Sequence, residues 1–331
     1  MPIVPMKVLL DHALEHKYAV GAYNVNNMEQ IQAIMQAAKE TKTPVVIQAS
    51  RGALKYSNLV YLKYLMVAAA EENPEIPLSF HLDHGNNLDS CKQAISLGFS
   101  SVMIDGSLKE DGKTPTTYAE NVEVTRSVVE YAHRFGVTVE GELGTLGGIE
   151  DGVGSGQIHL TDPDQAIQFV NETGVDALAV AIGTSHGAYK FKVAPKLALD
   201  IVEKIHARLP TLPLVMHGSS SIPPELVEIV NKYGGKMPNA MGVPMASIQE
   251  ASKMGVAKVN IDSDGRIAVT GAIRKVFAEQ PDKFDPRDYL KPARDALYAL
   301  VKRKMIELGT AGHAPEVPIK TLAEMKAAYG F

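Results

Sequence analysis

Residues 77–106 read PLSFHLDHGNNLDSCKQAISLGFSSVMIDG, and they contain one full repeat of the pattern that decides the fold. Two short apolar runs, at 77–83 and 100–106, have the composition of buried strands, and a segment with a helical pattern lies between them. Parallel strands need a long crossover connection of this kind, whereas antiparallel strands can be joined by a tight turn. The stretch therefore predicts a β-α-β unit.

The same alternation continues over most of the chain. Further strands are predicted at 19–25, 44–50, 137–143, 176–183, 212–218 and 257–263. Helical patterns separate them, for example at 28–42, 118–136 and 163–174. Eight strands joined by helices predict an α/β fold that closes as a (β/α)8 TIM barrel. An open doubly wound sheet is the alternative, but residues 23–26 lack the glycine-rich nucleotide loop that usually follows its first strand.

The length and composition fit one large soluble barrel. The chain has 331 residues, of which 45% are hydrophobic and 21% charged. We expect residues 1–331 to form one barrel domain, with residues 282–331 as a helical extension packed on it. The only cysteine, Cys91, leaves no partner for a disulfide within the chain.

Net charge and hydropathy limit the possible partners and the location. The net charge of −5 gives no basic surface for nucleic acid or an anionic membrane, so we expect neither as a partner. The N-terminal segment lacks the apolar core of a signal peptide, and no stretch approaches about 18 uninterrupted apolar residues. We therefore expect a cytoplasmic protein.

Three histidines lie at or just after the ends of predicted strands, and each is followed by glycine. They are His84, His186 and His217, and the sequence contains no other His-Gly pair. Because the carboxyl ends of barrel strands converge on one mouth, we expect these side chains to meet. Three neutral imidazoles with an open fourth position form a catalytic zinc site. His81 also lies on the third strand, and we interpret it as strand packing.

Acidic side chains end several of the same strands. Asp83 precedes the first histidine, Asp105 ends the fourth strand, and Glu140 and Glu142 end the fifth. Side chains alternate along a strand, so Asp83 and His84 cannot both face the interior while regular pairing lasts. We therefore expect the third strand to end there. A carboxylate beside a divalent cation can support a ligand, bind the metal or carry a proton.

Small residues at the last three strand ends predict phosphate binding. Gly187, the 218–221 stretch and the 260–263 stretch supply backbone N–H groups there, and Lys190 and Arg266 can add positive charge. A further segment, 141–156, contains seven glycines and predicts a mobile active-site loop. The connection at 238–251 has no chemistry that we can assign.

Together these motifs resemble the class II, metal-dependent fructose-1,6-bisphosphate aldolases, and specifically their shorter subclass. The resemblance covers nearly the whole chain. Its motifs are HLDHG, EGELG, GGxEDG, GTSHG, HGSS and VNIDSDGR, and they occur in order at the expected strand ends.

The resemblance implies roles for individual residues. It implies that His84, His186 and His217 bind the catalytic zinc and that Asp83 is the proton donor that acts on the C4 hydroxyl. Glu142 and Asp105 match positions that the family uses for a second or displaced metal. Glu150 matches the loop base at C1, Asn24 matches a residue that holds substrate oxygens, and Ser50 matches the position that faces the aldehyde product. The Asp262–Arg266 pair matches the arrangement at C4 and the far phosphate. The phosphate and ketose cradle is matched by Gly187, Gly218, Ser219, Ser220, Asn260, Ile261, Asp262 and Ser263.

The implied reaction is the reversible cleavage of fructose 1,6-bisphosphate into dihydroxyacetone phosphate and glyceraldehyde 3-phosphate. The family also implies homodimers or higher oligomers and, in some members, a monovalent cation. Tagatose-1,6-bisphosphate aldolase is the nearest alternative, because it shares the metal site. A Schiff-base aldolase using Lys258 or Lys190 leaves the three histidines unexplained. A non-catalytic barrel that binds metal or sugar phosphate is the remote alternative.

Overall fold

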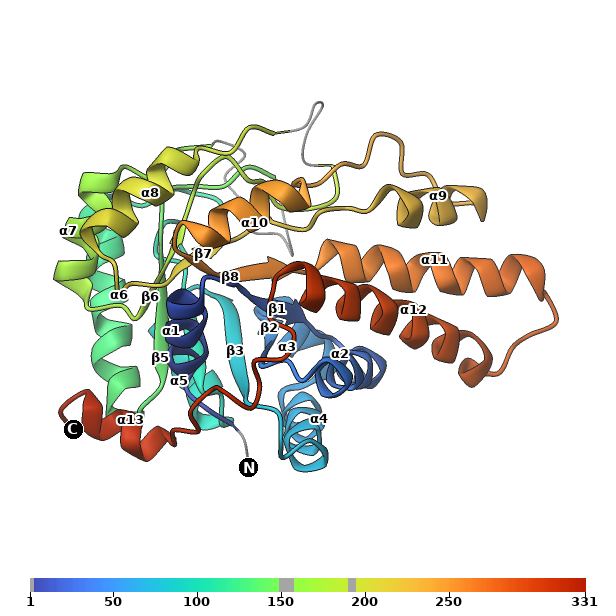
Figure 1. The fold of residues 1–331 in the computed structure, drawn as a ribbon, viewed down its shortest axis with the longest axis horizontal. Helices are drawn as coiled ribbons and strands as arrows, with labels where there is room; N and C mark the ends of the chain where they lie inside the picture. The colour runs from blue at the N-terminus through green and yellow to red at the C-terminus, as the bar shows by residue number, and fades with distance from the viewer. Residues whose placement is uncertain (1–2, 149–157, 190–194) are drawn as a thin grey trace.

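The computed structural model of the protein describes residues 3–148, 158–189 and 195–331. Its strands close into a parallel barrel in which each strand pairs with the next along the chain and β8 pairs with β1 (Figure 1). The strands are β1 (Val20–Asn24), β2 (Val45–Ser50), β3 (Leu78–Gly85), β4 (Ser101–Ile104), β5 (Thr138–Leu143), β6 (Ala177–Val180), β7 (Leu214–Met216) and β8 (Val256–Ile261). The predicted (β/α)8 barrel is confirmed, and the open doubly wound sheet is excluded.

Helices connect the strands and surround the barrel (Figure 1). They are α1 (Met6–His16), α2 (Met28–Thr41), α3 (Arg51–Ser57), α4 (Leu59–Glu72), α5 (Leu88–Ser96), α6 (Tyr118–Ala132), α7 (Pro163–Thr173), α8 (Leu199–Arg208), α9 (Pro224–Lys232), α10 (Met245–Lys253), α11 (Ser263–Glu279), α12 (Pro286–Glu307) and α13 (Leu322–Ala328). A short 3-10 helix, His133–Phe135, continues α6. The three helical segments named from the sequence correspond to α2, α6 with this 3-10 turn, and α7.

Local capping residues explain where α2 and α6 begin. The side chain of Asn27 accepts a hydrogen bond from the backbone N–H of Gln30 at the start of α2. Thr117 and Glu120 form a reciprocal capping box at α6. Contacts between residues close in the sequence therefore determine where α2 and α6 start.

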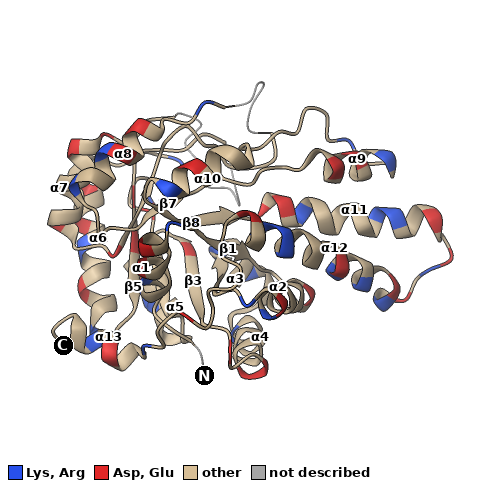
Figure 2. Ribbon diagram, in the orientation of Figure 1, with Lys and Arg blue, Asp and Glu red and all other residues tan. Residues whose placement is uncertain are grey.

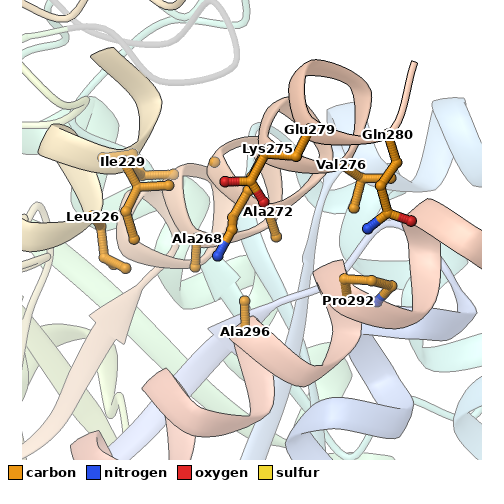
Figure 3. Close-up of a pocket in the computed structure, with 12 residues that line it drawn as sticks. Leu226, Ile229, Ala268, Ala272, Lys275, Val276, Glu279, Gln280, Pro292 and Ala296 are labelled. Carbon is orange, nitrogen blue, oxygen red and sulfur yellow. The ribbon is translucent and has the colours of Figure 1, made fainter. Parts of the chain in front are cut away.

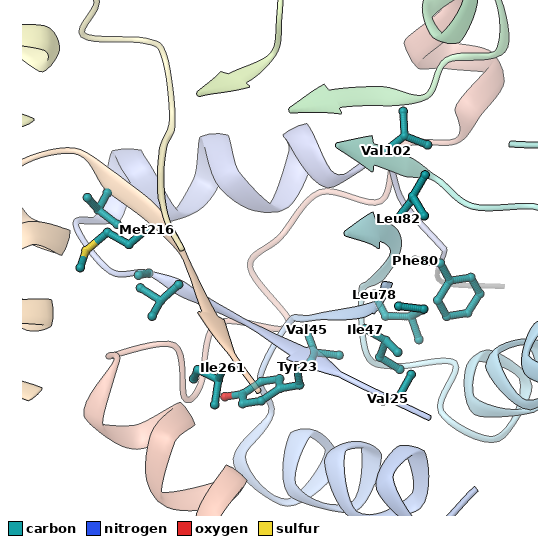
Figure 4. Close-up of a cluster of buried hydrophobic side chains, with 14 of the residues drawn as sticks. Tyr23, Val25, Val45, Ile47, Leu78, Phe80, Leu82, Val102, Met216 and Ile261 are labelled. Atoms are coloured by element: carbon teal, nitrogen blue, oxygen red, sulfur yellow. The ribbon is translucent and has the colours of Figure 1, made fainter. Parts of the chain in front are cut away.

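Strand side chains alternate between two apolar layers. Outward-facing residues such as Ile47, Leu82 and Ile261 lie between the strands and the outer helices (Figure 4). The apolar inward-facing residues are small, and they pack with the buried face of α1; they are Val20, Ala22, Val46, Ala177, Ala179, Val215 and Ala257. Helix α1 thus closes the N-terminal end of the barrel, away from the carboxyl ends of the strands.

The long helices α11 and α12 lie side by side and extend away from the barrel (Figure 1). Helix α12 also packs against α2, and α9 lies along α11. A groove of about 450 Å³ between α9, α11 and α12 is lined by apolar residues such as Leu226, Ile229 and Pro292 (Figure 3). None of the residues predicted to bind metal or substrate lines this groove.

Charges of both signs are interspersed along the outer helices (Figure 2). Several form pairs one helical turn apart, such as Lys204 with Asp200 at 2.8 Å and Lys291 with Asp295 at 3.0 Å. In the described ranges, no helix combines the length and the apolar character needed to cross a membrane.

Candidate metal centre and active site

Inward-facing positions become polar toward the carboxyl ends of the strands. Leu82 faces the outer apolar layer, so its neighbours His81 and Asp83 face into the barrel. Glu140 and Glu142 take the equivalent positions on β5, and all four polar side chains are buried. The barrel therefore contains a buried polar site next to the layer that α1 closes.

Three predicted histidines meet at the mouth of the barrel. His84 lies on β3, His186 follows β6, and His217 directly follows β7. Each offers one ring nitrogen within 4.8 Å of those of the other two, and all three side chains are buried. His84 Nε2 lies 3.1 Å from His217 Nδ1, although these residues are 133 positions apart in the chain. The fold brings together donors that no local spacing connects.

His84 reaches this position through an irregularity in β3. The expectation that the strand ends at this point is wrong, because β3 continues to Gly85. Its pairing with β2 is regular as far as Asp83, but its register with β4 shifts between Leu82 and Gly85. Within this bulge His84 has φ +53°, in the left-handed region that non-glycine residues rarely adopt. The bulge allows adjacent side chains to face one site.

A second cluster of possible metal ligands shares His84. His84 Nδ1 lies 3.3 Å from Asp105 Oδ2 and 4.0 Å from Glu142 Oε2, and one ligand atom of each residue lies within 4.8 Å of the others. Burial, followed by the charge of Asp105, raises the pKa of Glu142 well above its usual range. Burial alone would lower the pKa of His84, but Asp83 and these two carboxylates outweigh it and raise the pKa to about 10. The cluster thus favours a positive charge.

Asp83 lies among side-chain amides from three strands. It accepts hydrogen bonds from Asn24 Nδ2 at 3.0 Å, Gln48 Nε2 at 3.4 Å and Asn260 Nδ2 at 3.3 Å. Burial alone would raise the pKa of Asp83, but the neighbouring positive charges, His84 foremost, and the Asn24 hydrogen bond lower it to about 2. The carboxylate is therefore held in one orientation, 4.0 Å from His84 Nε2.

Glu140 connects a network that sequence reasoning did not assign. Its Oε1 lies 2.7 Å from His217 Nε2, on the opposite side of the ring from His84. Its Oε2 lies 2.9 Å from Lys258 Nζ and 3.5 Å from His81 Nε2. Lys258 is fully buried and also donates to Asn260 Oδ1 at 2.8 Å. The Schiff-base candidate is thus held in an ion pair, and His81 contacts this network.

The alternation of side chains along β5 was the available signal for Glu140. It lies two residues before Glu142, so both must face the same side of the strand. A carboxylate that accepts the N–H of one imidazole nitrogen fixes the tautomer and leaves a lone pair on the other nitrogen. For His217, this arrangement directs Nδ1 toward His84.

The loop after β7 is held against three neighbouring segments. Gly218 has φ +59°, and a Cβ there would lie 2.6 Å from the carbonyl of Ser185, so glycine is required. The N–H of Asp262 donates to Ser220 Oγ at 3.3 Å, and the N–H of Val243 donates to Ser220 O at 3.1 Å. Val243 belongs to the 238–251 connection, which therefore supports this loop.

Comparison with known proteins places the chain in a family. A family model described as class-II fructose-bisphosphate aldolase matches residues 4–313. The chain belongs to this family. The fructose-bisphosphate aldolase of Giardia intestinalis is 56% identical over 331 residues, covering 99% of this chain and 100% of the relative. That of Pseudomonas aeruginosa is 50% identical over 344 residues, covering 99% and 97%. This aldolase is accordingly a lyase of a metal-dependent family.

Solved structures agree with this placement. The YdjI aldolase of Escherichia coli K12 has a TM-score of 0.76 and 28% identity, covering 94% of this aldolase and 99% of that chain. The fructose-bisphosphate aldolase of Campylobacter jejuni has a TM-score of 0.69, with coverage of 92% and 94%. Its identity of 20% supports the fold alone.

The other predicted site residues of the aldolase lie near the same mouth. Arg266 forms a two-pronged pair with Asp262, with contacts of 2.8 and 2.5 Å. Ser50 is paired in register with Asp83, and its hydroxyl caps α3. Gly187 directly follows His186 and has φ +84°. The hydroxyl of Ser219 donates a hydrogen bond to His217 O at 3.0 Å. Ile261 ends β8, and Ser263 begins α11.

Two predicted residues fall outside the described ranges. Glu150 lies within 149–157, together with much of the glycine-rich segment, and Lys190 lies within 190–194. Their roles stay predictions from the sequence.

Proposed function

We propose that this aldolase catalyses the reversible cleavage of fructose 1,6-bisphosphate into dihydroxyacetone phosphate and glyceraldehyde 3-phosphate, with zinc as the metal. The observation that carries this proposal is the cluster of three buried imidazoles beside the buried carboxylate of Asp83. Such a cluster has the donor set of a catalytic zinc site, and the adjacent acid can move a proton.

The residues present fit a divalent cation. His84, His186 and His217 would hold it, and Asp105 and Glu142 offer, with His84, an alternative or second position. Among the described residues, Glu142 Oε2 is buried and accepts no hydrogen bond, as expected for an atom that serves a cation. A bound zinc ion supplies a Lewis acid that stabilises negative charge on the ketose oxygens.

Asp83 is the proposed group that moves the proton of the C4 hydroxyl. The amides of Asn24 and Asn260 orient its two oxygens, and they come from strands on the same side of the barrel. Its low pKa makes it an ionised acceptor in the cleavage direction. Glu150 is the proposed base at C1, on the strength of the sequence resemblance alone.

The loops after β6, β7 and β8 are proposed to hold the two phosphates and the ketose. Ser219 and Ser220 lie on the loop that carries His217, and Ser263 lies at the N-terminus of α11. A helix N-terminus and backbone N–H groups favour phosphate at this position. We expect the Asp262–Arg266 pair to favour fructose over tagatose, because the sequence resemblance assigns this pair to C4 and its side chains are held together by an ion pair.

Removal of divalent cations tests this function directly. EDTA is expected to abolish cleavage of fructose 1,6-bisphosphate, and added zinc is expected to restore it. Comparing kcat/KM for fructose and tagatose 1,6-bisphosphates then identifies the preferred sugar. Cleavage that persists after chelation, together with a covalent adduct trapped by borohydride, would instead support a Schiff-base mechanism through lysine.

Glu140→Gln is expected to weaken zinc binding by about 10- to 100-fold, because the substitution removes the charge that orients His217 and raises its basicity. Competition with a chelator of known affinity measures the effect. Glu130→Gln, an exposed change on α6, is the matched control and should bind zinc like the wild type. An unchanged affinity in Glu140→Gln would show that the network beneath His217 has no influence on the metal.

A further inference from the structure

We propose that Asp264 and Lys304 are positioning residues that hold the loop at 218–221 in the conformation that binds a substrate phosphate. This inference rests on the proposed function, because it assumes that this loop contacts phosphate. Neither residue is expected to touch the substrate.

Asp264 holds the far end of the loop. It is fully buried near the start of α11. Its Oδ1 accepts the backbone N–H of Ile222 at 2.7 Å, and its Oδ2 accepts the N–H of Ser221 at 3.2 Å and the Ser221 hydroxyl at 3.4 Å. Ile222 has φ +48°, an unfavourable conformation for a β-branched residue. The carboxylate therefore stabilises a turn that the sequence would not adopt alone.

Lys304 supplies the charge that allows this carboxylate to be buried. It lies on α12, far from the loop in sequence, and only 2% of its side chain is exposed. Its Nζ lies 3.4 Å from Asp264 Oδ2 and also donates to the Ser221 hydroxyl. Removing one partner of such a buried pair leaves the other charge uncompensated. The position of α12 is thus coupled to the loop.

The hydrogen bonds divide the loop into two parts. Asp264 occupies the N–H groups of Ser221 and Ile222, whereas no hydrogen bond in the described part of the chain uses the N–H of Ser219 or Ser220. The pair therefore leaves the two preceding N–H groups available to an anion. Lys304 also offsets the negative charge that Asp264 would otherwise present next to that anion.

Lys304→Met tests the inference, with Lys302→Met as the matched control. Lys302 lies on the same helix, but 40% of its side chain is exposed, and it pairs with Glu40 at 2.9 Å. Lys304→Met is expected to raise the KM for fructose 1,6-bisphosphate and the inhibition constant of dihydroxyacetone phosphate about 10-fold, with unchanged zinc content. Inhibition by unphosphorylated dihydroxyacetone should not change, and Lys304→Arg should restore most of the phosphate affinity. Lys302→Met should behave like the wild type.

A purely structural pair would give a different result. A lower melting temperature with unchanged KM and inhibition constants in Lys304→Met would overturn the inference. If that variant does not fold, the double variant Asp264→Asn/Lys304→Met, which buries no charge, is measured in the same way. If the wild type itself binds dihydroxyacetone as tightly as its phosphate, the proposed function of the loop fails; if only the variants show no effect, the positioning role alone fails.

Discussion

Asp83→Asn is expected to lower kcat for cleavage by at least about 100-fold while the zinc content stays at the wild-type level. The substitution keeps the size of the side chain and one of the two oxygens that accept the Asn24 and Asn260 amides, but it removes the ionised oxygen that accepts a proton. Because Asp83 is not a member of either ligand cluster, the metal should remain. Steady-state cleavage assays and metal analysis of the purified variant measure the two quantities.

Asp89→Asn is the matched control for this experiment. Asp89 lies a short distance further along the chain on α5, and its side chain is 90% exposed. It should retain wild-type kcat and KM. Wild-type turnover in Asp83→Asn would remove Asp83 from the proposed mechanism, and loss of zinc in that variant would assign it to the metal site instead.

His84→Gln is expected to lower kcat/KM by at least about 1,000-fold, together with the loss of bound zinc. His84 is the only residue common to the two ligand clusters found in the described ranges. Its substitution therefore disables both positions for a cation. A bound cation contributes several kcal/mol of charge stabilisation in the transition state, so its loss lowers the rate strongly. Glutamine keeps a polar side chain of similar length, so the cavity left behind is small.

His206→Gln provides the comparison for this second variant. His206 lies on α8, away from the three histidines, and the variant should keep both zinc and activity. Stoichiometric zinc with normal turnover in His84→Gln would mean that His186 and His217 bind the metal without it. Thermal melts of both variants separate loss of the metal from loss of the fold.

The barrel and the three histidines could be predicted because both depend on regular features. Buried parallel strands give short apolar runs, and the carboxyl ends of such strands converge wherever the barrel closes. His186 and His217 follow two of these runs closely, so the fold class alone brings them near each other. The sequence could therefore indicate which side chains meet without showing how each is oriented.

The layer formed by His81, Glu140 and Lys258 could not be predicted in the same way. These residues lie within strands, where a polar side chain can equally indicate a break in the barrel or a local ion pair. Only the closed barrel, in which β5 and β8 face each other across the interior, shows that Glu140 Oε2 and Lys258 Nζ lie 2.9 Å apart. The hydrogen bond from Val243 N to Ser220 O could not be predicted from the sequence either, because it depends on how the long 238–251 connection folds back onto the loop.

The left-handed backbone conformation of His84 lowers the stability of the fold, whereas its side chain is needed for the proposed function. For its backbone alone, glycine would be favoured over histidine by about 1–2 kcal/mol. Evolution toward greater thermal stability alone would therefore tend to replace His84, whereas selection for a working enzyme would retain it. In barrels of unknown activity, a histidine in a strand bulge with positive φ is thus a marker of a site worth testing first.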